Sequence, residues 1–162
     1  MPIQLVVENL NASIDDKVVL HDLAVTAQAG HILALMGKGG CGKSTFLRVI
    51  NRMAEEGGAV VSGHIMLDNS SIFMQDISLL RQKVGMVFTE PVLFAGNILG
   101  NITAGLRLQG IKKKQKLEEC AEETLGYMGI LEEFRDLLYT DASYLNRSQA
   151  QLVCIARALA LR

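Results

Sequence analysis

The sequence contains no run of apolar residues long enough to span a membrane, which takes about 18 consecutive residues, and its N-terminus lacks the layout of a signal peptide. It has no tryptophan and only three cysteines, at positions 41, 120 and 154. Because this cysteine set is odd and widely spaced, we expect reduced thiols in a cytosolic setting rather than a disulfide framework. The formal net charge of −1 provides no strong field to recruit nucleic acid, so we expect no nucleic-acid partner.

The remaining composition is that of a globular protein of single-domain size, with 162 residues of which 49% are hydrophobic. Its strongest chemical signal lies at residues 37–45, which match the phosphate-binding pattern G-x-x-x-x-G-K-S/T. Residues 31–36 before it are mostly apolar and are predicted to form a buried strand. Apolar residues after it recur at helical spacing. Strand, glycine loop and helix in this order predict a site for a nucleoside triphosphate.

Each residue type in this stretch suits phosphate binding. Glycines let successive backbone N–H groups turn toward a polyphosphate, and the N-terminus of the following helix adds partial positive charge. Lys43 is expected to reach the β- and γ-phosphates of ATP, and the Ser44 hydroxyl is expected to bind Mg²⁺. The predicted cofactor-binding residues are Gly37, Lys38, Gly39, Gly40, Cys41, Gly42, Lys43, Ser44 and Thr45.

Residues before and after this loop are predicted to form an antiparallel β region and a further strand. The alternation of Ile3, Leu5 and Val7 indicates a half-buried strand. Two short strands are expected at residues 18–20 and 23–27, after a turn at Asp15-Asp16. Further strands are expected at residues 63–67, ended by Asp68-Asn69, and at residues 84–88, which would be a central strand.

The second half of the chain is predicted to be helical. Asp76 can cap a short helix that runs through Leu80, Asn97 a second helix, and Ser148 the last one. The apolar residues expected on these helices are Ile98, Ile102 and Leu106, then Leu117, Ala121, Leu125 and Met128, and finally Leu152, Ile155, Ala156 and Leu159.

Four blocks in this order resemble the ATP-binding subunits of ABC transporters, especially those of phosphate importers. They are residues 40–53, 79–88, 107–111 and 154–160. The resemblance implies an α/β P-loop NTPase fold of ABC type, with an N-terminal antiparallel β region, an α/β core and an inserted helical subdomain. It makes residues 1–162 one incomplete ATP-binding domain, with the β region and P-loop core at about 1–88 and the helical subdomain from about 89.

The same resemblance implies a function. ATP binding and hydrolysis would be coupled to transmembrane permease subunits, with pairing of two ATP-binding subunits, at the cytoplasmic inner face of the cell membrane. Phosphate is the implied transport substrate, and ATP and Mg²⁺ are the implied cofactors.

Departures from the family pattern leave hydrolysis open. Thr89 stands where the family places a glutamine, and residues 145–149 replace the signature L-S-G-G-Q, so that only Leu145 and Gln149 match it. No aromatic residue stands at Ser13-Ile14, where one usually stacks on adenine. The sequence also stops before the strand that would carry the Walker B carboxylates. We therefore name no confident catalytic residue, although Thr89 and Gln149 occupy two of the expected positions.

Two alternative functions remain at this stage. The chain could be a non-hydrolysing nucleotide-binding remnant or a regulatory subunit. Lys38 also makes the loop read K-G-G-x-G-K-S/T, the deviant P-loop of partition-type ATPases. Those proteins usually carry the loop at their first strand, whereas here a β region comes first.

Overall fold

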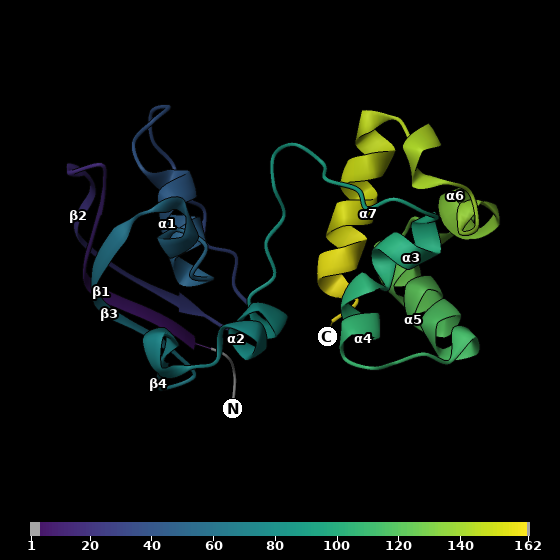
Figure 1. Cartoon of the computed structure of the whole chain (residues 1–162), viewed down its shortest axis with the longest axis horizontal. Helices are drawn as coiled ribbons and strands as arrows, with labels where there is room; N and C mark the ends of the chain where they lie inside the picture. Colours follow the sequence, from purple (N-terminus) through teal and green to yellow (C-terminus); the bar gives the residue numbers. More distant parts are fainter. Residues whose placement is uncertain (1–3, 162) are drawn as a thin grey trace. The chain divides into compact units, whose positions relative to one another are not determined.

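The structure, a computed structural model, describes residues 4–161, which divide into two units, one ending at Val84 and the other beginning at Gly85. The first unit contains the β-sheet and two helices, and the second is helical (Figure 1). Among the described residues, no helix is both long and apolar enough to cross a membrane.

The sheet of the first unit is antiparallel throughout, with the strand order β2-β1-β3-β4. Two-residue turns with positive φ join its hairpins, at Asp15-Asp16 (47° and 59°) and at Asp68-Asn69 (52° and 61°). Asp and Asn tolerate this left-handed conformation, which matches the twist of the strands they connect. The strands are β1 (Gln4–Ile14), β2 (Lys17–Gln28), β3 (Val60–Leu67) and β4 (Ser70–Ser71).

The predicted antiparallel region is therefore confirmed, with longer strands than expected. The two short strands predicted at residues 18–20 and 23–27 are one strand, β2, and β3 begins three residues before the predicted start at Gly63. Ile3, the first residue of the predicted opening strand, lies outside the described residues. Gly63 (φ 115°) faces an irregularity in β1, where a Cβ atom would come within 2.5 Å of the Asn9 carbonyl oxygen. Only glycine lets the two strands approach so closely here.

Helix α1 (Lys43–Ile50) covers the sheet and contributes Phe46, Val49 and Ile50 to a common core. A short helix, α2 (Ile77–Lys83), is capped by Asp76, whose carboxylate accepts the Leu79 N–H at 3.0 Å as predicted. Two single 3₁₀ turns, η1 (Glu55–Gly57) and η2 (Ile72–Met74), complete the unit. The other buried residues of this core are Val7, Leu10, Ala12, Leu20, Ala54, Ala59, Ile65, Leu67, Ile72 and Leu80.

Two predicted strands are wrong. Residues 31–36 and 84–88 have no regular secondary structure, and Ile32 (98% exposed) and Met36 (92%) face solvent. A strand requires a neighbour to pair its backbone N–H and C=O groups. Among residues 4–161 every strand belongs to the antiparallel sheet, so neither segment has the parallel partner that its apolar sequence suits.

The second unit contains five helices, and four of them contribute residues to one core (Figure 1). Asn97 caps α3 as predicted, accepting the Gly100 N–H at 2.8 Å. The predicted helix with Ile98, Ile102 and Leu106 is interrupted at Thr103, whose hydroxyl donates to the Leu99 carbonyl at 2.6 Å. The elements are α3 (Ile98–Ile102), α4 (Ala104–Leu108), α5 (Lys114–Tyr127), α6 (Leu131–Phe134), η3 (Arg135–Leu137), η4 (Ala142–Tyr144) and α7 (Arg147–Leu159).

The predicted cap of the last helix is wrong by two residues. Asn146, not Ser148, is the N-cap of α7, and its side chain accepts the Gln149 N–H at 3.0 Å. The Gln149 carboxamide in turn accepts the Asn146 N–H, so that the pair forms a capping box. The predicted apolar face is also shifted, because Ala150, Val153, Cys154 and Ala156 are the buried residues of α7.

Candidate functional site

The glycine loop is seated on the sheet through Gly42. This residue is buried, has φ 93° and forms the N-cap of α1. A Cβ atom here would lie 2.7 Å from Leu20 Cδ2 and 2.9 Å from the Val19 carbonyl oxygen, both of β2. Because only glycine satisfies both the left-handed φ and the close approach, Gly42 fixes where α1 begins.

The Lys43 ammonium is held against the loop. Its Nζ donates to the carbonyl oxygens of Gly37 and Lys38, each at 2.8 Å, and lies 3.5 Å from Cys41 Sγ. The loop also closes on itself, because the Cys41 N–H donates to the Lys38 carbonyl at 3.3 Å. The cation is thus fixed beside the first turn of an eight-residue helix that has no acidic residue there. Its charge and the helix dipole add, which favours an anionic ligand.

The other loop residues fit a polyphosphate. Lys38, Gly39, Gly40 and Cys41 are exposed, and Gly40 has φ 79°. A Cβ atom at Gly37 would come within 2.7 Å of Cys41 Sγ, so a side chain there would disturb the closed loop. Glycine therefore keeps a backbone surface open to a ligand.

The two hydroxyl residues lie in the first turn of α1, with Ser44 exposed and Thr45 half-buried. No group of three or more His, Cys, Asp or Glu that could hold a metal ion occurs in the described part of the chain. Mg²⁺ usually keeps waters and uses few protein ligands together with substrate phosphates, so a single hydroxyl suits it.

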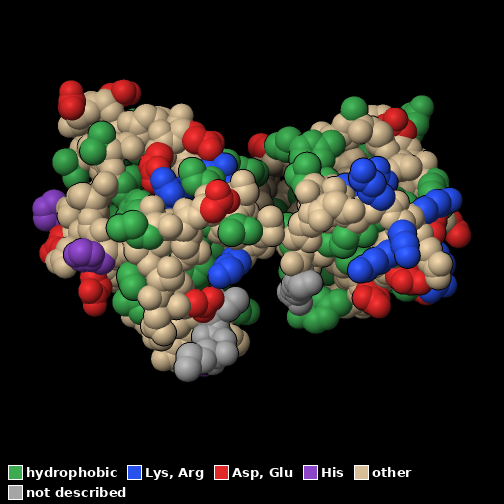
Figure 2. All heavy atoms as spheres, turned by 60° about the horizontal axis from the view of Figure 1, so that its bottom comes forward, with side chains coloured by type: hydrophobic (Ala, Val, Ile, Leu, Met, Phe, Trp, Pro, Cys, Tyr) green, Lys and Arg blue, Asp and Glu red, His purple; other side chains and the backbone are tan. Residues whose placement is uncertain are grey.

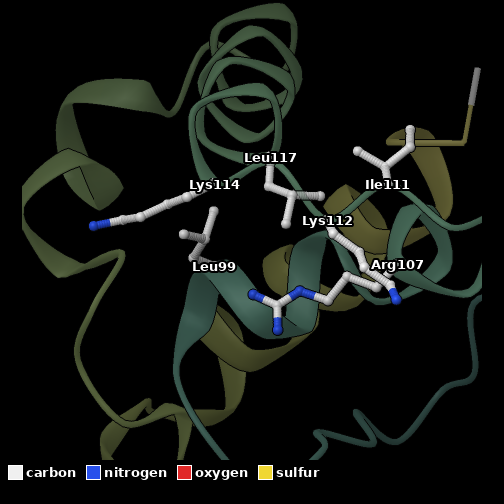
Figure 3. Close-up of a pocket in the computed structure, with 6 residues that line it drawn as sticks. All are labelled: Leu99, Arg107, Ile111, Lys112, Lys114 and Leu117. Carbon is white, nitrogen blue, oxygen red and sulfur yellow. The ribbon is translucent and has the colours of Figure 1, made fainter.

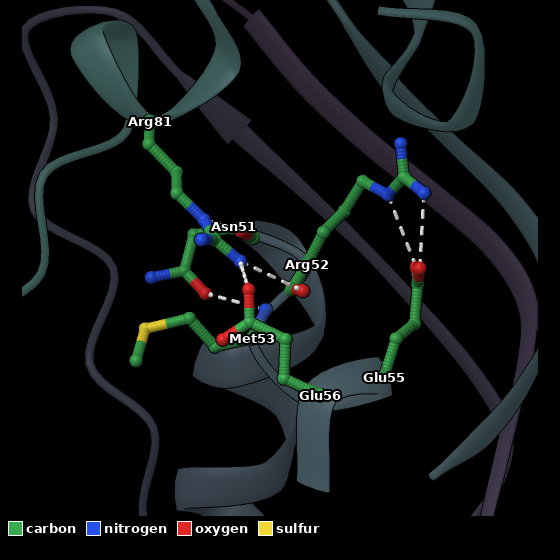
Figure 4. Close-up of polar contacts among 6 residues, drawn as sticks. All are labelled: Asn51, Arg52, Met53, Glu55, Glu56 and Arg81. Atoms are coloured by element: carbon green, nitrogen blue, oxygen red, sulfur yellow. Dashed lines mark hydrogen bonds and ion pairs between the residues drawn. The ribbon is translucent and has the colours of Figure 1, made fainter. Parts of the chain in front are cut away.

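A cluster at the far end of α1 was not predicted (Figure 4). Arg81 of α2 donates from Nε to the Asn51 carbonyl at 3.1 Å and from one terminal nitrogen to the Arg52 carbonyl at 3.1 Å. That nitrogen also lies 2.7 Å from a Glu56 carboxylate oxygen. Arg81 thus satisfies carbonyl groups that the end of α1 leaves without helical partners. No periodicity or capping pattern in the sequence indicated this role of Arg81.

Arg52 adds a second polar link in the same cluster. Its guanidinium forms an ion pair with Glu55 at 2.9 Å, and the hydrogen bond to this partner raises the Arg52 pKa above its ordinary value. The same guanidinium lies over the Phe73 ring, 5.9 Å from its centroid.

The two candidate catalytic positions lie in the second unit, apart in sequence from the loop. Thr89 is exposed in a bend. Gln149 is occupied by structural contacts, since its carboxamide completes the capping box and donates to Glu133 at 3.2 Å. Arg147, at a glycine position of the family signature, pairs with Glu90 at 2.5 Å.

The expected adenine position gives no stacking surface. Ile14 is half-buried against the core of the first unit and pairs with Lys17 across the hairpin. Its neighbour Ser13 is likewise half-buried.

The chain is similar to known proteins of one family. A sequence profile described as ABC transporter matches residues 20–162. The phosphate import ATP-binding protein of Vibrio parahaemolyticus is 38% identical over 158 residues, which are 96% of this chain and 58% of that protein. That of Borreliella burgdorferi is 40% identical over 157 residues, with coverage of 95% and 60%. The chain thus spans about 60% of the length of these relatives.

Solved structures show the same fold. The CbiO1 protein of Clostridium perfringens, described as part of an ABC transporter complex, matches with a TM-score of 0.79 and 26% identity, covering 97% of this chain and 61% of that one. A bacterial ABC exporter solved with ATP bound matches with a TM-score of 0.82 and 24% identity, covering 99% and 28%. The predicted fold class is confirmed by these matches.

Proposed function

Because the chain belongs to the ABC transporter family, we propose that it forms the ATP-binding part of an importer subunit and binds ATP with Mg²⁺ through residues 37–45. The observation that carries this proposal is the Lys43 ammonium, fixed by two carbonyl oxygens of the loop beside the N-terminus of α1. Phosphate is the proposed transport substrate, because the similar curated proteins are phosphate import ATP-binding proteins. The profile match to residues 20–162 argues against the partition-type alternative.

Each part of the loop has a separate task in this proposal. Backbone N–H groups of residues 39–42 and of the first turn of α1 bind phosphate oxygens, and Lys43 binds the β- and γ-phosphates. The Ser44 hydroxyl holds Mg²⁺, which neutralises charge on the phosphates, and Thr45 supports the first turn. Gly42 keeps this arrangement in place by seating the loop on β2.

Membership of the family supports proposals for the partner and the cellular location. We propose that the subunit acts with transmembrane permease subunits, pairs with a second ATP-binding subunit, and works at the cytoplasmic face of the membrane. The helical second unit would be the part that meets the permease. The chain covers 58% of the Vibrio parahaemolyticus relative, and these proposals concern a protein of that relative's full length.

A non-hydrolysing role is the second candidate, and the contacts of the second unit favour it. Gln149 already bonds to Asn146 and Glu133, Arg147 is paired with Glu90, and Thr89 lacks the carboxamide that would meet Mg²⁺ and water. Water-positioning and general-base groups each contribute roughly 10²–10⁴ in rate. We therefore expect no measurable phosphate release from the 162-residue polypeptide, and Thr89→Gln alone should not restore it. Robust release that Lys43→Ala abolishes would decide for a working ATPase.

Titration calorimetry with Mg-ATP tests the binding proposal. Lys43→Ala removes a charge-assisted contact worth about 1.5–3 kcal/mol, so affinity should fall roughly ten- to a hundredfold. Arg48→Ala is the matched control, since this exposed cation lies later on the same helix. Equal binding by Lys43→Ala and the parent would refute the site. Because Ile14 offers no ring, GTP should compete with ATP almost equally, and a strong preference for ATP would count against our placement of the base.

A further inference from the structure

A pocket of about 350 Å³ lies within the helical unit, away from any residue of the glycine loop in sequence (Figure 3). It is lined by Leu99 of α3, Arg107 of α4, Ile111 and Lys112 of the connection, and Lys114 and Leu117 of α5. Three lining residues are cationic, three are aliphatic, and none is acidic. The size falls in the range of small-molecule sites.

The cations of the pocket differ in how they are paired. Lys114 lies 3.6 Å from a Glu118 oxygen and 4.9 Å from the centroid of the Tyr139 ring. Arg107 and Lys112 are exposed and form no ion pair within residues 4–161. Figure 3 shows the Arg107 side chain extending toward Leu99, with Lys112 beside its base, whereas Lys114 points away from the other five residues. The pocket therefore presents two unpaired cations.

The helix that borders the pocket increases this positive potential. Helix α5 has 14 residues, its N-cap is Lys113 without a side-chain hydrogen bond, and its first turn contains no acidic residue. Lys114 and Lys116 lie in that turn, at the positive end of the helix dipole, where cations are unfavourable. An anion beside this end would relieve the repulsion. The two acidic residues nearest to this turn, Glu118 and Glu119, are already bonded to Lys114 and Gln115.

The rest of the lining is apolar. Leu99 and Leu117 are buried (3% and 4% exposed), and Ile111 is half-buried. A simple inorganic anion would leave this apolar lining unused. In the space-filling view, Lys and Arg side chains gather on one face of the helical unit, with acidic side chains among them (Figure 2).

We propose that this pocket binds an amphiphilic organic phosphate, with its phosphate between Arg107 and Lys112 and its apolar part against Leu99, Ile111 and Leu117. The Arg107 guanidinium suits a phosphate because it donates two parallel hydrogen bonds. Two sources carry this chemistry, the headgroup of an anionic phospholipid and a soluble phosphate ester. The site does not involve the nucleotide loop and is independent of the proposed function.

Binding to vesicles and to a soluble ester tests the proposal with the full 162-residue chain in the absence of nucleotide. The probes are phosphatidylcholine vesicles with and without phosphatidylglycerol, and glycerol 3-phosphate and dihexanoyl phosphatidic acid in solution. Arg107→Gln combined with Lys112→Gln removes the unpaired cations. Lys113→Gln combined with Lys116→Gln removes the same charge from positions that do not line the pocket.

If the pocket binds the phosphate, the two double variants should differ in affinity. Each cation at a lipid surface contributes roughly fivefold in affinity wherever it lies, so both double variants should bind vesicles more weakly. Only the pocket variant also loses direct charge-assisted contacts with the phosphate, so it should bind at least about tenfold more weakly than the control variant. Ile111→Ser should weaken binding of dihexanoyl phosphatidic acid and leave glycerol 3-phosphate unaffected. Circular dichroism spectra matching the parent show that each variant is folded.

The binding results distinguish a phospholipid headgroup from a soluble phosphate ester as the ligand. Vesicle binding that depends on phosphatidylglycerol and on Arg107 identifies a lipid ligand. Binding of the soluble phosphates without vesicle binding identifies a soluble ester, and both results support the pocket. Equal losses in the two double variants would show a diffuse charge effect and overturn the proposal, as would binding of none of the phosphates.

Discussion

The helical unit is held together by a polar network around Asn101, and its removal gives a sharp test of the packing. The Asn101 side chain is 1% exposed and makes four hydrogen bonds. It donates to the carbonyl oxygens of Phe94 (3.0 Å) and Asn97 (3.1 Å). It accepts from the Phe94 N–H (2.8 Å) and the Arg157 guanidinium (2.7 Å).

Arg157 ties this asparagine to helix α7. Its guanidinium also donates to the carbonyl oxygens of Val92 (2.8 Å) and Asn101 (3.1 Å) and lies 4.2 Å from the centroid of the Phe94 ring. Burial lowers the Arg157 pKa below its ordinary value, with Cys154 acting in the opposite direction, and the group stays charged at neutral pH. The network thus joins the segment before α3, α3 itself and α7.

Asn101→Ala leaves the Phe94 N–H and one guanidinium nitrogen without these partners. At about 1–3 kcal/mol for each of these two polar groups left unsatisfied, the loss in unfolding free energy should be about 2–6 kcal/mol. With a urea dependence of about 1–3 kcal/mol per molar, the midpoint of unfolding should fall by roughly 2 M.

The chain offers a probe for this unit alone. Its three tyrosines, Tyr127, Tyr139 and Tyr144, all lie beyond residue 84, and there is no tryptophan. Tyrosine fluorescence during urea unfolding therefore follows the helical unit. Gln115→Ala is the control, since this exposed side chain bonds only to Glu119 one turn away and should change the free energy by less than about 0.5 kcal/mol. A midpoint for Asn101→Ala equal to that of the control would refute the reasoning.

Two further predictions concern single polar side chains. Arg81→Gln removes the donors that bind the carbonyl oxygens of Asn51 and Arg52, so amide hydrogen exchange in the last turn of α1 should accelerate about tenfold or more, whereas Lys83→Gln should leave it unchanged. Exchange as slow as in the parent would contradict this role. The Asp141 pKa lies below its ordinary value of 3.8 because the carboxylate accepts the Ser143 N–H. Its stabilisation is therefore complete above about pH 4 and is lost as the pH falls through the folded-state value. Asp141→Asn should destabilise the unit at pH 6 and not at pH 2 by tyrosine-monitored unfolding, and a constant difference at both pH values would exclude this carboxylate as the cause.

Features set by neighbouring residues were predictable from the sequence. The turns at Asp15-Asp16 and Asp68-Asn69 and the caps at Asp76 and Asn97 depend on the φ preferences and short side chains of those residues, and the structure confirms them. The capping box of α7 was also readable, because Asn146 is followed by Gln149 at the required spacing. The prediction of Ser148 as the N-cap did not take the Gln149 side chain into account.

Features set by distant residues were not predictable in the same way. The apolar sequence of residues 31–36 is compatible with a strand, but a strand also needs a paired neighbour, which local pattern does not reveal. At the site, the sequence motif located the loop. The close approach of Gly42 to Val19 and Leu20 and the contacts of Arg81 join residues far apart in the sequence, so they could be recognised only in the tertiary structure.

The exposed segment before the loop leads to a last prediction about the 162-residue polypeptide. Ile32 (98% exposed) and Met36 (92%) lie on a segment without regular secondary structure, so both apolar side chains and backbone groups are open to another chain. Burying two such side chains is worth roughly 3–6 kcal/mol before the costs of association. We therefore expect concentration-dependent self-association without nucleotide, which Ile32→Ser combined with Met36→Ser weakens at least about tenfold by sedimentation equilibrium. Leu108→Ser combined with Met74→Ser is the matched control, because these residues are 91% and 87% exposed but lie in the helical elements α4 and η2 and not on a segment without regular secondary structure. If both pairs weakened association equally, exposed apolar area alone would be responsible and pairing along residues 31–36 would be wrong; a parent that stays monomeric at all concentrations would reject the prediction altogether.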